Sequence, residues 1–219
     1  MKFNIIYIKT PRAGSTSVSS ALRDYGEAND LIVSHDPKPK TTFNINTNHL
    51  HYTDRNFNYL KNKVDHKLET LVVSTIRDPL KRCRSHYMGG ANKFDMDFNE
   101  WYLQYGTRSW VVGGWKKDFK HQYTSNNYMS SYLGYDYQDI NEETLKRYDH
   151  IFIADRFTES FDVFGKMVGF DFKVYHEHNE LPEPYEFTDE VKELFRENNE
   201  RDYLLYDLVN KKLDDNISR

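Results

Sequence analysis

The stretch IIYIKTPRAGSTSVSSALRDYG, residues 5–26, passes from a β-favouring run into a polar turn and then into an amphipathic segment. In that last part the apolar residues recur at the spacing of one helix face: Val18, Ala21, Leu22 and Tyr25. A turn that leads from a strand into a helix presents unpaired backbone N–H groups and the positive end of the helix dipole. These groups favour a bound phosphate or sulfate, so the stretch predicts a strand, an anion-binding loop and a helix.

The residues of the turn fit an anion better than a nucleoside triphosphate with its metal. Gly14 lets the backbone approach a ligand closely, and Arg12 adds a fixed positive charge. Hydroxyl donors follow at Ser15, Thr16 and Ser17. The loop of nucleotide triphosphatases needs Lys directly after the glycine, where this chain has Ser15. We therefore expect an anion site without an obligatory metal; a polar turn that only caps the helix is the alternative.

A second segment, VVSTIRDPLKRCRSHY (residues 72–87), has the same organisation. Arg77 directly follows an apolar strand, Pro79 fits the first turn of a helix, and Ser85 comes eight residues after Arg77. Two such strand ends lying side by side would direct two phosphate-binding groups into one crevice. The two segments together predict a ligand with two phosphate groups.

Strands alternate with helices along the chain. The clearest apolar runs that fit strands are residues 3–8, 71–76 and 150–155. Helical patterns separate them and also close the chain, at about residues 188–198 and 200–213. This alternation predicts an α/β fold, a P-loop-like three-layer sandwich with a central, mostly parallel sheet. The length fits a single domain over residues 1–219.

Three local features set expectations for the element boundaries. Gly26 stands where the C-cap of the first helix would sit. Thr158 is expected to cap the helix that carries Phe161 and Phe164. Residues 27–48 are polar and lack a sustained period, which predicts an irregular excursion that could border a cleft.

Composition narrows the class of protein. The net charge of −4 argues against a general nucleic-acid binder, which would need a broad positive surface. The single cysteine, Cys83, cannot form an internal disulfide. A strongly negative mean hydropathy of −0.85 and the lack of a run of about 18 apolar residues argue against a membrane span. The sequence therefore predicts a soluble, cytoplasmic protein.

The two phosphate-binding segments resemble those of the PAPS-dependent sulfotransferases, the carbohydrate type related to heparan sulfate 2-O-sulfotransferase. Residues 11–17 are similar to the family loop Pro-Lys-x-Gly-x-Thr-Ser/Thr, with Ala13 at its variable position. Arg77 and Ser85 match the family's second motif. The resemblance implies that the loop binds the 5′-phosphosulfate of 3′-phosphoadenosine 5′-phosphosulfate (PAPS). It also implies that Arg77 and Ser85 bind the 3′-phosphate, and that no metal is needed.

The resemblance also implies a proton acceptor. In the 2-O-sulfotransferase relatives the base is a His followed three residues later by Tyr and five later by Asp, and His49, Tyr52 and Asp54 reproduce that spacing. His51 is a neighbour or a substitute, and a His near its ordinary pKa suits general base catalysis. Two surface histidines in a polar loop are the alternative interpretation.

Four further features concern departures from the family pattern and segments that could contact the ligands. Arg12 replaces the family Lys and can act only through its charge, so that Lys9 could substitute as an acid. Asp155 stands where the family has Glu, and the sequence assigns it no role. Residues 110–123 combine aromatic rings with cations and are a candidate wall for a sugar acceptor, or else a helix that buries Trp. Residues 179–187 are a candidate lid.

These features predict an enzyme that moves a sulfuryl group from PAPS to a hydroxyl acceptor, a carbohydrate or another small molecule, without nucleic acid as a partner. Arg12 and the loop amides would stabilise the leaving phosphate, and His49 would accept the hydroxyl proton during in-line attack. Two alternatives stay open. One is a small-molecule kinase that uses Mg-ATP, and the other is a non-catalytic protein that binds a nucleotide or a glycan.

Overall fold

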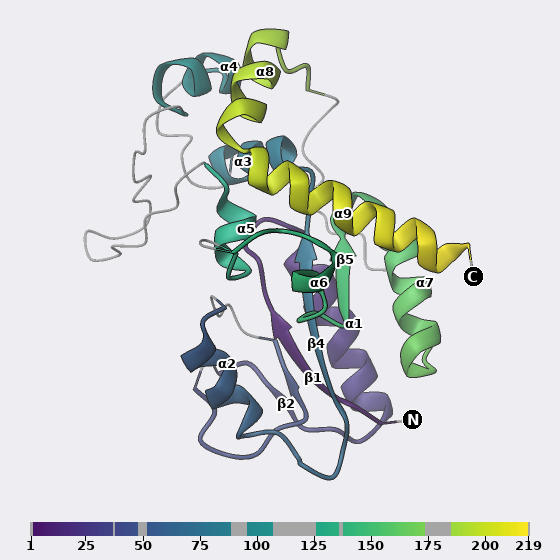
Figure 1. Ribbon diagram of the computed structural model, residues 1–219. Helices are drawn as coiled ribbons and strands as arrows, with labels where there is room; N and C mark the ends of the chain where they lie inside the picture. Colours follow the sequence, from purple (N-terminus) through teal and green to yellow (C-terminus); the bar gives the residue numbers. More distant parts are fainter. Residues whose placement is uncertain are drawn as a thin grey trace.

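A computed structural model describes residues 2–36, 38–47, 52–88, 96–106, 126–135, 138–173 and 185–218. Its centre is a five-stranded sheet in the order β2-β3-β1-β4-β5, in which all neighbouring strands run parallel (Figure 1). The strands are β1 (Asn4–Ile8), β2 (Val33–Ser34), β3 (Ile45–Asn46), β4 (Thr70–Ile76) and β5 (His150–Ile153). The predicted α/β fold with a central parallel sheet is confirmed.

The described helices surround the sheet and extend past its carboxyl edge. They are α1 (Ser15–Ala28), α2 (Asp54–Lys61), α3 (Pro79–His86), α4 (Phe98–Trp101), α5 (Tyr128–Tyr132), α6 (Glu142–Leu145), α7 (Phe157–Val168), α8 (Asp189–Asn198) and α9 (Glu200–Ile217), with a π-helical turn η2 (Tyr102–Gly106) and a 3₁₀ turn η3 (Ala154–Arg156). Within the described ranges, no helix combines the length and the apolar character that crossing a membrane requires.

One face of the sheet packs against α1 and α7. Because side chains of a strand alternate between the two faces, Ile5 and Tyr7 of β1 point to this layer. There they join a buried cluster with Leu22 of α1 and Phe164 of α7. The apolar face predicted for the first helix is thus the face that covers the sheet.

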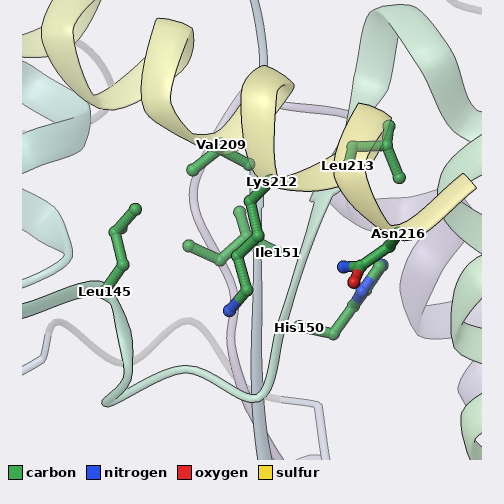
Figure 2. Close-up of a pocket in the computed structure, with 7 residues that line it drawn as sticks. All are labelled: Leu145, His150, Ile151, Val209, Lys212, Leu213 and Asn216. Carbon is green, nitrogen blue, oxygen red and sulfur yellow. The ribbon is translucent and has the colours of Figure 1, made fainter. Parts of the chain in front are cut away.

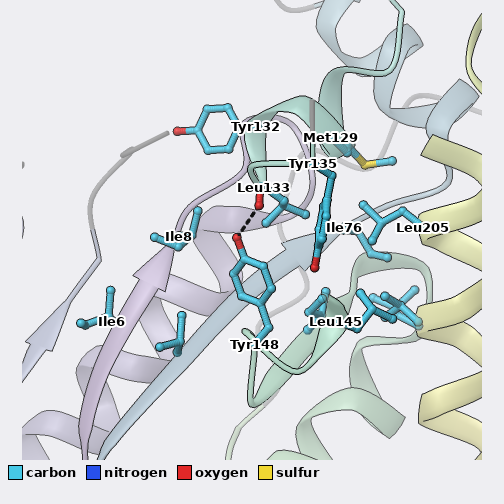
Figure 3. Close-up of a cluster of buried hydrophobic side chains, with 14 of the residues drawn as sticks. Ile6, Ile8, Ile76, Met129, Tyr132, Leu133, Tyr135, Leu145, Tyr148 and Leu205 are labelled. Atoms are coloured by element: carbon cyan, nitrogen blue, oxygen red, sulfur yellow. Dashed lines mark hydrogen bonds between the residues drawn. The ribbon is translucent and has the colours of Figure 1, made fainter. Parts of the chain in front are cut away.

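The opposite face packs against α5, α6 and α9. Ile6 and Ile8 of β1 point to this side and join a second cluster that includes Leu205 of α9 (Figure 3). The buried hydroxyl of Tyr148 in this cluster donates a hydrogen bond to the carbonyl of Leu133 at 3.0 Å. A buried polar group therefore has its partner, as a stable core requires.

A third cluster lies beyond the carboxyl ends of the strands, where α3, α4 and α8 meet (Figure 1). Leu80 and Cys83 of α3 pack there with Trp101 of α4 and Phe195 of α8. Burial raises the pKa of the Cys83 thiol to about 11, so this thiol stays protonated at neutral pH. Cys83 is a core residue rather than a nucleophile.

The predicted end of the first helix is wrong, and residues 27–48 contain two short strands that the sequence did not indicate. Helix α1 does not end at Gly26 but continues to Ala28, and the excursion contains the short strands β2 and β3. A Cβ atom at Gly26 would lie 2.5 Å from Cγ2 of Val33, so the glycine allows the helix to approach β2 closely. Its role is tertiary packing and not helix termination.

The predicted cap at Thr158 is also wrong. Helix α7 already begins at Phe157, and its N-cap position is Arg156, whose side chain makes no capping hydrogen bond. The preceding turn η3 (Ala154–Arg156) leads directly into the helix. Phe161 and Phe164 are buried on α7 as expected.

A small cavity lies between the amino end of β5 and α9 (Figure 2). It is therefore at the end of β5 opposite to the carboxyl edge of the sheet. Its volume of about 10 Å³ leaves room for about one water molecule. Asn216 lies beside the imidazole of His150, whose buried Nε2 has no hydrogen-bond partner. Burial, reinforced by the charge of Lys212, lowers the pKa of His150 from 6.5 to about 3. His150 is therefore a neutral core residue.

This buried imidazole should make stability depend on pH. The unfolded chain takes up the proton at about pH 6.5, well before the folded protein does, so stability is present above pH 6.5 and is lost as the pH falls. The loss from this group should be about 1.4 kcal/mol per pH unit. Urea unfolding at pH 7 and pH 5 should show it, and His150→Phe should reduce it. An unchanged pH dependence in the variant would contradict this assignment.

Candidate anion-binding site

The turn from β1 to α1 contains two residues with a positive φ. Arg12 and Gly14 have φ of 63° and 70°, and Ala13 between them does not have a positive φ. Such turns direct successive N–H groups towards one side, where they form a concavity that suits an anion. Ala13 is fully buried, whereas the Arg12 side chain is exposed. The loop is thus anchored by Ala13 and presents Arg12 to solvent.

The N-terminus of α1 offers its N–H groups to a ligand. Gly14 occupies the N-cap position, so no side chain caps the helix, and the first turn contains no acidic residue. Ser15 and Ser17 are buried, and the Oγ of Ser17 has no hydrogen-bond partner. Thr16 is exposed. An anion placed here would meet the positive end of a 14-residue helix without competition from a carboxylate of its first turn.

Gly14 is also required by packing. A Cβ atom at this position would lie 2.4 Å from Cζ of Phe157 and 3.2 Å from the Cβ of Ala154. Both residues follow β5, so the loop after β1 rests on the segment after β5. The glycine therefore serves the backbone conformation and the close approach at the same time.

The second predicted turn, from β4 to α3, is held by hydrogen bonds. Asp78 caps α3, because its Oδ1 accepts from the backbone N–H of Lys81 at 2.8 Å, and Pro79 occupies the first turn. The N–H of Asp78 itself donates to Oδ2 of Asp155 at 2.7 Å. Arg77 and Ser85 are both half-buried, so each retains access to solvent.

Both turns lie at the same edge of the sheet because β1 and β4 are neighbours. Ile8 pairs with Ser74, and the Oγ of Ser74 donates to the Ile8 carbonyl at 2.7 Å. The same Oγ is 3.3 Å from Oγ1 of Thr10, in the loop that follows β1. The chain leaves β1 towards β2 and leaves β4 towards β5. This point is where open parallel sheets bind ligands.

The first loop and α3 lie close enough to interact electrostatically. Burial and, to a smaller extent, the positive charges of Arg82 and Arg12 together lower the pKa of His86 on α3 from 6.5 to about 4. Arg12 belongs to the β1-α1 loop and Arg82 to α3. The structure thus places Arg12 within electrostatic range of α3.

Sequence reasoning missed two basic residues of α3. Arg82 is 2% exposed and its guanidinium lies 4.2 Å from the centre of the Tyr128 ring, while Arg84 is 6% exposed and lies 4.1 Å from that of Tyr185. The Nε atoms of both have no hydrogen-bond partner. Burial lowers the pKa of Arg84; Tyr185 and Asp97 act in the opposite direction, and the charge of Arg77 adds to the lowering. The signal was present in the sequence as a run of basic residues within a helix that Pro79 opens.

His49 and His51 lie outside the described residues, as do residues 110–123 and most of the candidate lid. Two residues of the predicted His-Tyr-Asp spacing are described. The N–H of Tyr52 donates to the carbonyl of Tyr132 at 3.0 Å, and Asp54 is the first residue of α2. Both residues therefore have a role in the fold: Tyr52 joins the segment before α2 to α5, and Asp54 begins α2.

Among the described residues, no group of three His, Cys, Asp or Glu side chains could hold a metal ion. The carboxyl edge instead combines an uncapped helix N-terminus with basic side chains from the loop after β1 and from α3, a set of donors that can bind phosphate or sulfate groups. No protein-family model matches the chain, and no curated protein matches its sequence.

Replacement of Gly14 by Ala should destabilise the protein. A side chain at φ of 70° is strained, and its Cβ would displace the Phe157 ring. The free energy of unfolding should fall by about 2 kcal/mol or more, as measured by urea titration.

Gly26→Ala is the matched control for this change. Its Cβ would lie 2.5 Å from Cγ2 of Val33 and 3.1 Å from Cδ1 of Ile45, but Gly26 has an ordinary helical backbone, in which Ala is favoured over Gly by about 1 kcal/mol. The loss at Gly26 should therefore be smaller. Equal losses in the two variants would show that the loop conformation does not depend on Gly14.

Proposed function

We propose that the chain is a PAPS-dependent sulfotransferase that moves a sulfuryl group to a hydroxyl acceptor, of carbohydrate type by resemblance. The main support is the position of the two turns. The uncapped N-terminus of α1 and the Arg77 turn follow adjacent parallel strands at the point where the chain connections diverge. A bisphosphorylated nucleotide has one phosphate group for each of the two turns.

Each turn has a role in the proposed binding mode. The 5′-phosphosulfate would lie on the N–H groups of Ser15 to Ser17, next to Arg12. The 3′-phosphate would lie on Arg77 and Ser85. Arg is suited to this task because its planar group donates two parallel hydrogen bonds to a phosphate and stays charged.

The proposed chemistry is transfer of the sulfuryl group by in-line attack of the acceptor oxygen. The S–O bond to the 5′-phosphate breaks while the bond to the acceptor oxygen forms, and His49 takes the hydroxyl proton. Negative charge grows on the departing phosphate. Arg12 and the loop amides would stabilise that charge, in the way that fixed donors assist phosphoryl transfer.

Calorimetry with nucleotides tests the binding mode. Adenosine 3′,5′-bisphosphate should bind more tightly than adenosine 5′-monophosphate, and Arg77→Ala should remove about 1.5–3 kcal/mol of this preference, roughly a ten- to hundredfold change. Arg23→Ala, at an exposed position on α1, is the control and should leave the preference unchanged. If the wild-type protein binds both nucleotides equally well, the assignment is wrong.

Transfer of labelled sulfate from PAPS to a panel of oligosaccharides tests the chemistry. His49→Ala should lower turnover by about a hundredfold to ten-thousandfold, because a general base contributes that much, and should leave binding of the bisphosphate unchanged. Binding without transfer by the wild-type protein would favour a non-catalytic nucleotide-binding protein. Phosphorylation that needs Mg-ATP would favour the kinase.

A further inference from the structure

Asp155 joins three elements at the carboxyl edge of the sheet. It belongs to the η3 turn that follows β5. Its carboxylate accepts the backbone N–H of Asp78 at 2.7 Å, the ammonium of Lys81 at 3.1 Å and the hydroxyl of Tyr206 at 3.3 Å. These donors come from the turn before α3, from α3 itself and from α9. The Asp155 side chain is only 15% exposed, so water competes little for these bonds.

The hydrogen bond to Asp78 acts directly on Arg77. The N–H of Asp78 belongs to the peptide group that joins the two residues, and a peptide group is planar. Fixing this N–H fixes the plane of the whole group, including the carbonyl of Arg77. The direction in which the Arg77 side chain leaves the backbone is therefore tied to the position of Asp155.

The arrangement brings two carboxylates close together. Burial raises the pKa of Asp78, and the negative charge of Asp155 raises it further. Lys81 offsets part of this repulsion through its contact with Asp155. The Asp78 side chain alone already caps α3, so the helix start has its own cap without Asp155. The additional contact controls the residue before the cap, which is Arg77.

We propose that Asp155 is a positioning residue that holds Arg77 towards the 3′-phosphate and thereby sets the preference for a bisphosphorylated nucleotide. This inference rests on the proposed function. Asp155 touches no ligand group in this account and acts only through the peptide between Arg77 and Asp78. Asp155, which follows β5, thus changes the ligand preference of a site formed by the turns after β1 and β4.

The same pair of strands provides a matched control. Asp149, just before β5, accepts the backbone N–H of Val72 in β4 at 2.7 Å through its Oδ2. The bond has the same chemistry and length as the one from Asp78 to Asp155, but it lies towards the amino end of the strands. Loss of Asp149 should weaken the junction of β4 and β5 without reaching Arg77.

The test is the ratio of the dissociation constants for adenosine 5′-monophosphate and adenosine 3′,5′-bisphosphate, measured by calorimetry. Asp155→Ala should weaken bisphosphate binding about tenfold or more and leave monophosphate binding unchanged. Asp155→Asn keeps an oxygen that can accept from Asp78 and should retain part of the preference; it also serves if the Ala variant does not fold. Asp149→Ala should lower the melting temperature but leave the ratio at the wild-type value.

The outcomes separate this inference from the proposed function. If the wild-type protein does not distinguish the two nucleotides, the proposed function fails and the inference fails with it. If the wild-type protein distinguishes them and folded Asp155 variants do so equally well, only the inference is overturned. An equal loss of affinity for both nucleotides would also overturn it, since that would indicate a general disturbance of the edge.

Discussion

The parallel pairing of β1 with β4 determines where every group of the candidate site lies. Their register runs from the pair Asn4 and Thr70 to the pair Ile8 and Ser74, so both strands end at one edge within a few residues. The Ser74 hydroxyl, bonded to the Ile8 carbonyl, locks this register at its last pair. A slip by one residue would turn the buried side chains of one strand to the wrong face. The strand pairing thus places the two turns at one edge, and contacts of the turns themselves, such as those of Thr10 and Asp78, hold them there.

Two buried basic residues of α3 are only partly hydrogen-bonded. Arg82 and Arg84 are buried on α3 with nitrogen atoms that have no hydrogen-bond partner. Burying a charged group without full pairing is unfavourable, and stacking on Tyr128 and Tyr185 offsets only part of this cost. Asp202 is a nearby carboxylate, but it already accepts N–H groups at the start of α5. Asp97 also interacts with Arg84, so carboxylates offset part of the charge of both guanidinium groups.

The sequence allowed prediction of those parts of the fold that depend on long local patterns. The apolar runs of β1 and β4 and the proline at the start of α3 identified both strand ends, and so the position of Arg77. The strands β2 and β3 were not predicted, because each has two residues, too few to show an alternation of apolar and polar side chains. The packing role of Gly26 was not predicted, because it depends on a tertiary contact with Val33 that no local sequence pattern indicates.

The contacts within the site could not be predicted from the sequence either, because they join residues that are far apart in the chain. Asp155 and Asp78 are 77 positions apart, and only the pairing of β4 with β5 brings them together. The burial of Arg82 and Arg84 likewise depends on the packing of α3 against distant segments. Residue types and spacing could therefore indicate the chemistry of the edge, but not which side chains orient its ligands.

The most direct test of the account is a crystal structure of the protein with adenosine 3′,5′-bisphosphate. The account predicts the 5′-phosphate on the N–H groups of Ser15 to Ser17 and the 3′-phosphate within hydrogen-bond distance of the Arg77 guanidinium, in one continuous nucleotide that bridges the ends of β1 and β4. A nucleotide bound elsewhere, or one whose 3′-phosphate points away from Arg77, would contradict it.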